Sequence, residues 1–327
     1  MNHIFGPVNS RRLGRSLGID LFEQKICNLN CIYCEVGPNV ITTCERKSYT
    51  PLSRILEEMT SFLRDPKQIA EVDTITVTAS GEPTLHADLG SLLSTLREMT
   101  GKTIAVLTNG TTLSDPGIRA DLHNADLVIP SLDSAREESF RKINRPAPCL
   151  DLQTIIKGLH TFCAEFTGRI HLEILFSRTI NDRDEDIAAL LDALSRVTLE
   201  RIQINTVARP PLEAFAQPLS PKRLRKIADR LSTLPCSPMV ELLSMGQEDS
   251  DTLTDDCTAH RSEPADASAI LERIIDTIKR RPCTADDINR IFHLESADKV
   301  EQLLEPLAVS GKLKRHTHHG TVYYQIG

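Results

Sequence analysis

CNLNCIYC, residues 27–34, places Cys27, Cys31 and Cys34 at the spacing CxxxCxxC. Four cysteine thiolates hold an ordinary electron-carrying 4Fe-4S cluster, so three of them leave one iron without a protein ligand. A closed zinc site takes four ligands, and no further CxxC or HxxxH element follows at a suitable distance. The spacing therefore predicts a 4Fe-4S cluster with one open iron, which is a reaction site. The alternative is three reduced cysteines whose spacing is accidental.

The composition indicates an intracellular enzyme. The chain has 327 residues, 40% of them hydrophobic, and a formal net charge of -7. This length suits one large domain plus a small one. The start of the chain has no apolar run long enough for a signal peptide or a membrane span, so we expect a cytoplasmic protein without membrane association. The negative charge predicts no general attraction to nucleic acid.

The cysteine count argues against a disulfide framework. Nine cysteines at irregular spacings suit a reducing compartment with a metal centre. Six of them lie outside the motif and show no ligand-like pairing, so we expect buried structural thiols. These six are Cys44, Cys149, Cys163, Cys236, Cys257 and Cys283.

Apolar, β-rich runs alternate with amphipathic segments from about residue 17 to residue 240. This alternation predicts βα units around a parallel sheet, in the form of a partial (β/α)6 barrel of the TIM type. Ligands in β/α barrels bind at the C-terminal ends of the strands. We expect strands at residues 17–26, 73–79, 103–108, 126–132, 169–176 and 201–207, and helices at 51–64, 85–99, 150–166, 184–196 and 221–231.

Polar groups follow the second, third and fourth strands. SGEPTL, residues 80–85, follows the second strand and should lie beside the cysteine motif, which follows the first. Its Gly81 allows a close backbone approach, and the charge of Glu82 suits an ammonium group. LTNG with Asn109 and SLD with Ser131 and Asp133 follow the next two strands. The alternatives are a plain strand-to-helix connection at Gly81–Pro83 and an ordinary Asn-Gly turn.

The last two strands and the N-terminus supply further candidates. Asn205 can satisfy loop backbone or hydrogen-bond a cofactor, and Arg209 before a Pro pair could bind a carboxylate or phosphate at the barrel mouth. Arg11, Arg12 and Arg15 precede the cysteine motif, where three guanidinium groups could hold an anion. A solvated basic turn is the alternative for this arginine group.

The cysteine motif and the Gly-Glu-Pro turn together resemble the radical SAM enzymes. In that family, S-adenosylmethionine (SAM) chelates the open iron of the 4Fe-4S cluster, and the cofactors perform the radical chemistry. The resemblance implies that Tyr33 borders the adenine and that Gly81, Glu82 and Pro83 receive the methionine amino group. It assigns Ser131 and Asp133 to the ribose and methionine region, and it makes Asn109 and Asn205 candidate cofactor-binding residues.

The first 240 residues resemble the Fe-S oxidoreductase group related to wyosine (tRNA) synthases. The resemblance implies that SAM is cleaved to a 5'-deoxyadenosyl radical, which abstracts hydrogen from an unidentified substrate, for which a tRNA base is the first hypothesis. An external one-electron reductant of the flavodoxin or ferredoxin type would be the partner. Modification of a peptide or small metabolite is the alternative. No cysteine precedes Cys27, whereas wyosine synthases carry cysteines there for an auxiliary cluster.

A second domain is expected after the radical SAM part at residues 1–245. Residues 246–266 are acidic and nearly free of large apolar groups, as in a linker. Residues 267–327 read as helices at 267–281, 284–292 and 296–310 and a hairpin at 312–326, an order that resembles a winged helix. Lys312, Lys314, Arg315 and His316 on the wing could contact tRNA, whereas the acidic third helix favours a protein partner or a structural role. A non-catalytic Fe-S-sensing regulator is a further alternative.

Overall fold

The computed structural model describes residues 3–10, 12–78, 80–243, 267–292 and 294–326. The chain forms two compact units, Met1–Leu242 and Leu243–Gly327. Arg11 and the segment at 246–266, expected to be a linker, lie outside the described residues. Within the described ranges, no helix combines the length and apolar character that a membrane crossing requires.

The first unit is built on an eight-stranded sheet that is parallel except at one edge. Its strand order is β1-β2-β5-β6-β7-β8-β9-β10, and only β1 runs antiparallel to its neighbour. Two short strands, β3 (Ile26–Cys27) and β4 (Ile41–Thr42), pair separately. The large sheet consists of β1 (Ile4–Ser10), β2 (Gly14–Asp20), β5 (Thr74–Thr78), β6 (Thr103–Thr108), β7 (Leu127–Pro130), β8 (Arg169–Phe176), β9 (Arg201–Thr206) and β10 (Met239–Leu242).

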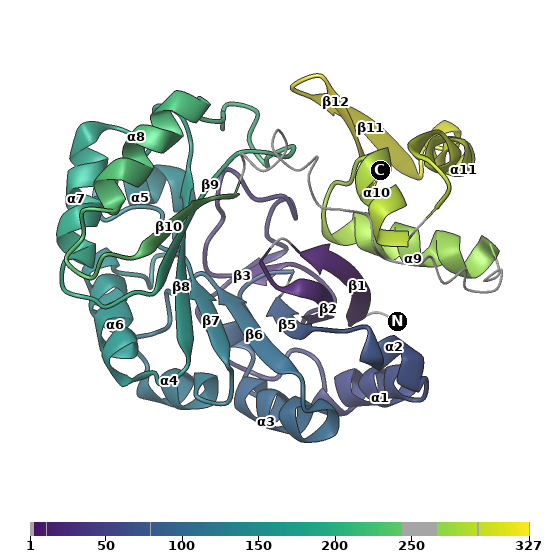
Figure 1. Cartoon of the computed structure of the whole chain (residues 1–327), viewed down its shortest axis with the longest axis horizontal. Helices are drawn as coiled ribbons and strands as arrows, with labels where there is room; N and C mark the ends of the chain where they lie inside the picture. Colours follow the sequence, from purple (N-terminus) through teal and green to yellow (C-terminus); the bar gives the residue numbers. More distant parts are fainter. Residues whose placement is uncertain (1–2, 11, 79, 244–266, 293, 327) are drawn as a thin grey trace. The chain divides into compact units, whose positions relative to one another are not determined.

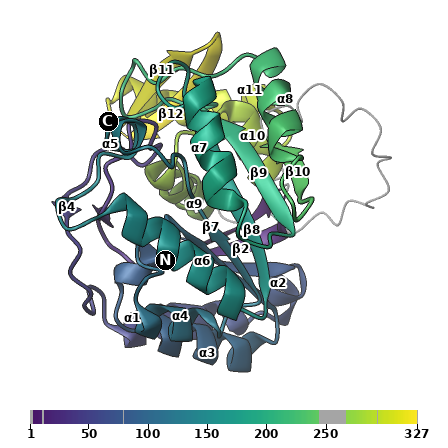
Figure 2. The ribbon, with the colours of Figure 1, turned by 90° about the vertical axis from the view of Figure 1, so that its left-hand side faces the viewer.

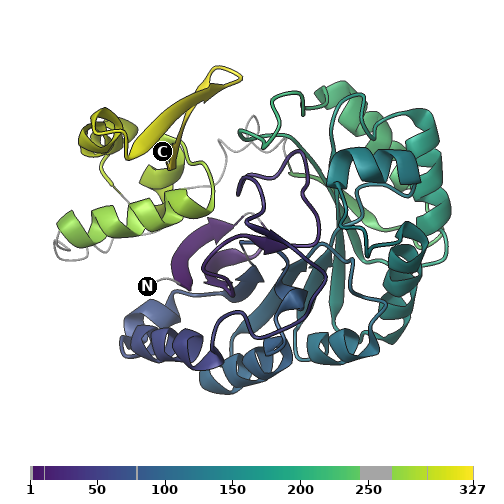
Figure 3. The same ribbon diagram turned by 180° about the vertical axis from the view of Figure 1, so that it is seen from behind.

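Helices follow the outer side of this curved sheet, as Figures 1 and 3 show. Figure 2 shows α6 and α7 lying in front of the central strands. The α/β class and the partial barrel predicted from the sequence are confirmed, with β1 and β10 added at the two edges. The helices are α1 (Leu52–Leu63), α2 (Pro66–Ala70), α3 (Leu89–Thr100), α4 (Pro116–Leu122), α5 (Glu137–Asn144), α6 (Leu152–Glu165), α7 (Asp184–Leu194) and α8 (Pro221–Leu231), with the 3-10 turn η1 (Pro83–Leu85).

The strands alternate between an apolar face that packs against the helices and a second face of mixed character. Ile75 and Val77 of β5 are fully buried in the main core with helix residues such as Leu92. On the other face, Ser16 of β2 and Thr76 of β5 join hydroxyl groups at 2.6 Å. Successive side chains of a strand point to opposite faces, so one face builds the core and the other lines the barrel interior.

Several helices begin at a side-chain cap followed by proline. Asp115 accepts hydrogen bonds from the backbone of α4 with Pro116 at the first helical position, and Ser220 caps α8 in the same way before Pro221. These residues satisfy backbone N–H groups that have no partner within the helix. Asp115 and Ser220 therefore fix where α4 and α8 begin after the loops that precede them.

The second unit contains α9 (Ala267–Arg280), α10 (Ala285–Phe292), α11 (Ala297–Val309) and a hairpin of β11 (Leu313–His318) and β12 (Thr321–Ile326). Ser296 caps α11 by accepting from the backbone N–H of Lys299 at 3.2 Å. Ile288, Leu304 and Tyr324 lie in a separate buried core. The predicted order of three helices and a hairpin is therefore observed.

Candidate iron-sulfur and cofactor site

The three motif cysteines lie on one segment, residues 25–43, here called the cluster loop. Neighbouring segments pair with its backbone from several sides. Asn30 N–H donates to the carbonyl of Asn144 and Ile32 N–H to the carbonyl of Ile143, both at 2.9 Å, while the N–H of Glu213 donates to the Ile32 carbonyl at 2.9 Å. The end of α5 and the segment after β9 therefore fix the path of the loop.

Each of the three sulfurs accepts a hydrogen bond from a nitrogen. The sulfur of Cys27 lies 3.5 Å from the backbone nitrogen of Leu29 and 3.7 Å from Asn109 Nδ2. The sulfur of Cys31 lies 3.4 Å from Asn144 Nδ2, and that of Cys34 lies 2.9 Å from Lys25 Nζ. Donors of this kind stabilise a negatively charged sulfur, which is the form that binds metal.

The donor set fits an iron-sulfur cluster. All three cysteines are free, and burial raises the pKa of the Cys27 thiol to about 12, with the nearby charge of Glu82 as a second cause. Burial also raises the pKa of Cys31, so a bound cation would favour the thiolate form of both sulfurs. No three His, Cys, Asp or Glu side chains in the described residues are arranged to hold a single metal ion. A cluster instead spreads its cysteines over several irons.

The Gly-Glu-Pro segment lies directly against the cluster loop, as its place after the second predicted strand indicated. Ile26 N–H donates to the Ser80 carbonyl, and the N–H of Glu82 donates to the Ile26 carbonyl, both at 3.0 Å. Gly81 has a φ of +139°, and a Cβ atom there would lie 1.7 Å from the carbonyl oxygen of Ile26. Glycine is therefore required at this position because two backbone segments meet there.

Glu82 is a buried carboxylate with partners on both oxygens. Its Oε1 accepts from the N–H of Thr84 at 3.0 Å, from the Thr84 hydroxyl at 2.7 Å and from the Thr108 hydroxyl at 2.6 Å. Its Oε2 accepts from the N–H of Asn109 at 2.6 Å. Burial raises the pKa of Glu82, and these hydrogen bonds oppose that shift. Pro83, which begins η1, is buried beside it.

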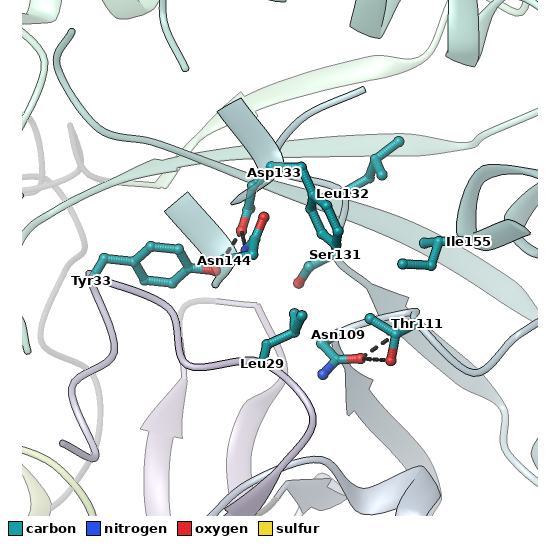
Figure 4. A pocket seen from close by; sticks show the side chains of 10 residues that line it. Leu29, Tyr33, Asn109, Thr111, Ser131, Leu132, Asp133, Asn144 and Ile155 are labelled. Atoms are coloured by element: carbon teal, nitrogen blue, oxygen red, sulfur yellow. Dashed lines mark hydrogen bonds between the residues drawn. The ribbon is translucent and has the colours of Figure 1, made fainter. Parts of the chain in front are cut away.

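A pocket lies next to the cysteines, and four of the predicted cofactor residues line it (Figure 4). Asp133 organises one wall, since it accepts from the Tyr33 hydroxyl at 2.5 Å, from Asn144 Nδ2 at 2.6 Å and from the N–H of Leu175 at 2.9 Å. Burial raises the pKa of Asp133. The lining residues are Leu29, Tyr33, Asn109, Thr111, Ser131, Leu132, Asp133, Phe140, Asn144 and Ile155.

Sequence reasoning missed Asn144, the residue that joins the pocket to the cysteines. It ends α5, a helix that was not predicted, and only 3% of it is exposed. Its Nδ2 contacts both Asp133 and Cys31, while its Oδ1 is buried without a hydrogen-bond partner. Two signals in the sequence could have indicated this helix: the i,i+3 spacing of Phe140 and Ile143, and the i,i+4 charge pairs Glu137–Arg141 and Glu138–Lys142.

Asn205 and Arg209 do not line the pocket. Asn205 accepts from the N–H of Thr206 at 2.9 Å. Arg209 pairs with Glu35, the residue after Cys34, at 3.3 Å. Its carboxylate partner therefore belongs to the cluster loop of the chain itself.

The two described N-terminal arginines, Arg12 and Arg15, contact different parts of the barrel. Arg12 donates to Glu173 of β8 and, at 3.2 Å, to the side-chain oxygen of Gln203 on β9. Arg15 pairs with Glu71 at 2.6 Å, ahead of β5, whereas the cluster loop contacts the segment after β5. The charges of both arginines are therefore engaged by carboxylates of the chain, and Arg11 lies outside the described residues.

Two cysteines that were expected to be free thiols form a disulfide instead. Cys44 follows β4 and Cys149 follows α5, with Cα atoms 6.6 Å apart and a sequence separation of 105. The two segments meet because the N–H of Ala147 donates to the Asn28 carbonyl at 2.9 Å in the cluster loop. Spacing along the chain gave no sign of this pairing, since it depends on the folded path of the loop.

Residues 24–192 match the family model of the Radical SAM superfamily, and this chain belongs to that superfamily. Among curated relatives it is 37% identical to a UPF0026 protein of Synechocystis sp., over 64% of this chain and 77% of the relative. It is 34% identical to a UPF0026 protein of Methanocaldococcus jannaschii, over 69% of this chain and 70% of the relative. It is also 32% identical to a protein named GTPase Obg from Brachyspira hyodysenteriae, over 99% of this chain and 45% of that protein.

Solved structures share the fold. The chain superposes on TYW1 with a lysine-pyruvate adduct bound at a TM-score of 0.52 and 19% identity, covering 67% of this chain and 73% of that one. A radical SAM methyltransferase from Sphaerobacter thermophilus gives a TM-score of 0.52 at 15% identity, covering 69% and 66%. The resemblance to the radical SAM fold inferred from the sequence is thus confirmed.

Proposed function

We propose that this chain is a radical SAM enzyme in which Cys27, Cys31 and Cys34 hold a 4Fe-4S cluster and the adjacent pocket binds SAM. When bound and reduced by one electron, this pair of cofactors supplies a 5'-deoxyadenosyl radical that abstracts a hydrogen atom from a substrate. The observation that carries the proposal is that all three sulfurs accept hydrogen bonds from nitrogen donors beside a pocket lined by polar and apolar side chains.

The pocket residues divide the binding work between polar and apolar groups. Asp133 holds Tyr33 and Asn144 in fixed positions through its three hydrogen bonds. Ser131 adds a hydroxyl group to the wall, and the unpartnered Oδ1 of Asn144 can accept from a ligand hydroxyl or amine. Phe140, like the aliphatic lining residues, limits the access of water.

The test is anaerobic reconstitution with iron and sulfide, followed by reduction with SAM and quantification of 5'-deoxyadenosine. Cys31→Ala should lose the product, because it removes one of three ligands. Cys163→Ala is the matched control, since Cys163 is a free cysteine outside the cluster loop. A stable cluster that never cleaves SAM would contradict the proposal and favour the Fe-S-sensing regulator.

The cluster needs an electron from outside the chain, and we propose a flavodoxin-type or ferredoxin-type donor. Its test is replacement of the chemical reductant by reduced flavodoxin or ferredoxin in the same assay. Sustained product formation supports such a donor, and product formed only with the chemical reductant argues against it.

For the second unit we propose a protein-binding or structural role, which we favour over tRNA binding. Arg315 of the wing pairs with Glu305 of α11 and lies over the ring of Tyr324 at 5.8 Å, so part of the basic wing is neutralised within the unit. Lys312 and Lys314 remain exposed. The test is whether the full chain retains tRNA in a salt-dependent way and whether a Lys312→Glu, Lys314→Glu variant loses this retention. That result would favour tRNA binding over a protein-binding or structural role. It would also support a tRNA base as substrate over a peptide or small metabolite.

A further inference from the structure

Lys25 places a buried ammonium group against one of the cluster cysteines. Only 6% of the residue is exposed, and its Nζ lies 2.9 Å from the sulfur of Cys34. The same nitrogen donates to the carbonyl of Gly37. The sulfur of Cys34 and the carbonyl of Gly37 are its contacts among the described residues, and neither is a carboxylate. A buried ammonium is costly unless a negative group compensates it.

The negative group is available once Cys34 is a thiolate. We propose that Lys25 is the counter-charge of the iron-sulfur cluster, and that its hydrogen bond to Cys34 positions this ligand and raises the reduction potential of the cluster. The inference rests on the proposed function, because it requires a cluster on the three cysteines. It goes further because it assigns a role to Lys25, which lies outside the cysteine motif. This residue would control how readily the cluster accepts its electron.

The physical basis is the change of charge on reduction. A cluster held by thiolates gains one negative charge when it is reduced, and a nearby positive charge stabilises the reduced form more than the oxidised one. Hydrogen bonds to cluster sulfurs and the net charge around them set reduction potentials in iron-sulfur proteins. Lys25 supplies both effects at one sulfur.

The backbone of Lys25 strengthens this placement. Its carbonyl accepts from the N–H of Val40 at 3.0 Å and from the N–H of Ile41 at 3.1 Å. The side chain meanwhile reaches Cys34 and Gly37. Lys25 therefore joins the start of the cluster loop to its middle and its end, which restricts the ammonium group to the neighbourhood of the sulfur.

A role as a nucleophilic amine that forms a Schiff base with a carbonyl substrate fits these contacts less well. Lys25 does not line the pocket, and its amine is engaged by a sulfur and a carbonyl. Lys47, the next lysine along the chain, is exposed. Its Nζ lies 3.4 Å from Glu45 Oε2 and over the ring of Tyr49. The geometry at Lys25 thus favours an electrostatic role over a nucleophilic one.

The experiment compares midpoint potentials by EPR-monitored redox titration of anaerobically reconstituted protein without SAM. Lys25→Met should shift the potential to a more negative value, and Lys25→Arg should stay near the wild type because it keeps the charge and N–H donors. Lys47→Met, which removes an exposed lysine, should match the wild type. An unchanged potential in Lys25→Met with full iron content overturns the inference.

A measurement on the unmodified chain covers the case in which Lys25→Met fails to fold or to bind iron. Protein labelled with 15N-lysine should show a 15N hyperfine coupling to the reduced cluster by pulsed EPR, since one lysine nitrogen contacts a ligand sulfur. The absence of this coupling in iron-loaded protein also overturns the inference. A wild-type chain that binds no cluster at all contradicts the proposed function itself, so the two failures are distinguishable.

Discussion

Asn144 Nδ2 lies 3.4 Å from the sulfur of Cys31, so a residue at the end of α5 contacts a proposed iron ligand from outside the cysteine motif. The same amide nitrogen donates to Asp133 in the pocket wall. One side chain therefore links the metal-binding part of the site to the part that we expect to bind SAM. A substitution in the pocket wall should therefore affect the cysteines, and a substitution at the cysteines should affect the pocket, through the Asn144 amide.

Replacement of Asn144 by leucine should weaken SAM binding about tenfold, or ~1.4 kcal/mol, because a hydrogen-bond acceptor is lost and Asp133 loses a donor. Equilibrium dialysis with the cluster-loaded protein measures this affinity. Asn124→Leu serves as the control, since Asn124 contacts the backbone near α3 and not the pocket. Equal affinity in both variants would show that Asn144 does not contact the ligand.

Replacement of Gly81 by alanine should disrupt the contact between the Gly-Glu-Pro segment and the cluster loop. The new Cβ would collide with the carbonyl of Ile26 at a backbone φ of +139°. Gly101 is the matched control, because its φ of +61° is also positive but its Cβ would meet no atom within 4 Å. We expect Gly101→Ala to cost about 1 kcal/mol in unfolding free energy and Gly81→Ala to cost clearly more. Urea denaturation and iron content per chain measure the two effects.

Asp133 should make the stability of the cofactor-free chain fall with rising pH. Burial raises its pKa above the ordinary value of 3.8. From 3.8 up to the raised pKa, the folded chain holds a proton that the unfolded chain has released, so the free energy of unfolding decreases as pH rises. Denaturation at a series of pH values should show this slope in the wild type and a weaker one in Asp133→Asn. Parallel curves for the two proteins would contradict the assignment.

Asp151 provides a control of opposite sign for that experiment. It caps α6 through the N–H of Thr154, and this hydrogen bond lowers the pKa of Asp151 below 3.8. Its contribution to stability is present above 3.8 and is lost as pH falls through the lowered pKa. Asp151→Asn should therefore change the pH dependence only at the acidic end.

The Cys44–Cys149 cross-link should make the thermal stability of the chain sensitive to reductant. The two cysteines have a sequence separation of 105, and in the chain-entropy account a loop of about 100 residues contributes about 4.7 kcal/mol. Cys149→Ser should lower the melting temperature of the oxidised chain and abolish its response to reductant. Cys163→Ser should leave that response intact, because Cys163 is free. Mass spectrometry of a non-reduced digest identifies the linked peptides directly.

Much of the central sheet could be predicted from local pattern alone. The expected strands at 103–108 and 169–176 coincide with β6 and β8, and the expected helix at 221–231 coincides with α8. Apolar β-branched residues bounded by turns mark these strands. Ser220 followed by Pro221 marks the start of α8. Local chemistry and tertiary structure agree in these elements.

The edges and small helices could not be predicted in this way. β1 contains Gly6 and Pro7 and pairs on one side only, and β10 is four partly exposed residues. α5 has few apolar residues, of which Phe140 and Ile143 are buried. These elements depend on neighbours that the local sequence does not specify.

The candidate site likewise contains residues that could be predicted from the sequence and residues that could not. Tyr33, Asn109, Ser131 and Asp133 lie at or beyond the C-terminal ends of predicted strands, and the structure brings them to one pocket because these ends of parallel strands share an edge. Asn144 contacts the cysteines from another segment, and Lys25 reaches Cys34 only through the folded path of the cluster loop, so no spacing rule identifies their partners. Arg12 and Arg15 were placed by nearness in sequence, whereas the structure pairs Arg15 with Glu71 ahead of β5 and Arg12 with Glu173, which bridges to Ser131 of the pocket wall.

The pairing of the cluster loop with distant segments has a consequence for the order of biosynthesis. Its backbone partners include Ser80, Asn144 and Glu213. During translation, the loop is complete long before the last of these residues has left the ribosome. The fully enclosed site therefore exists only after some 213 residues have been made, so the loop of the nascent chain lacks part of its backbone partners until then.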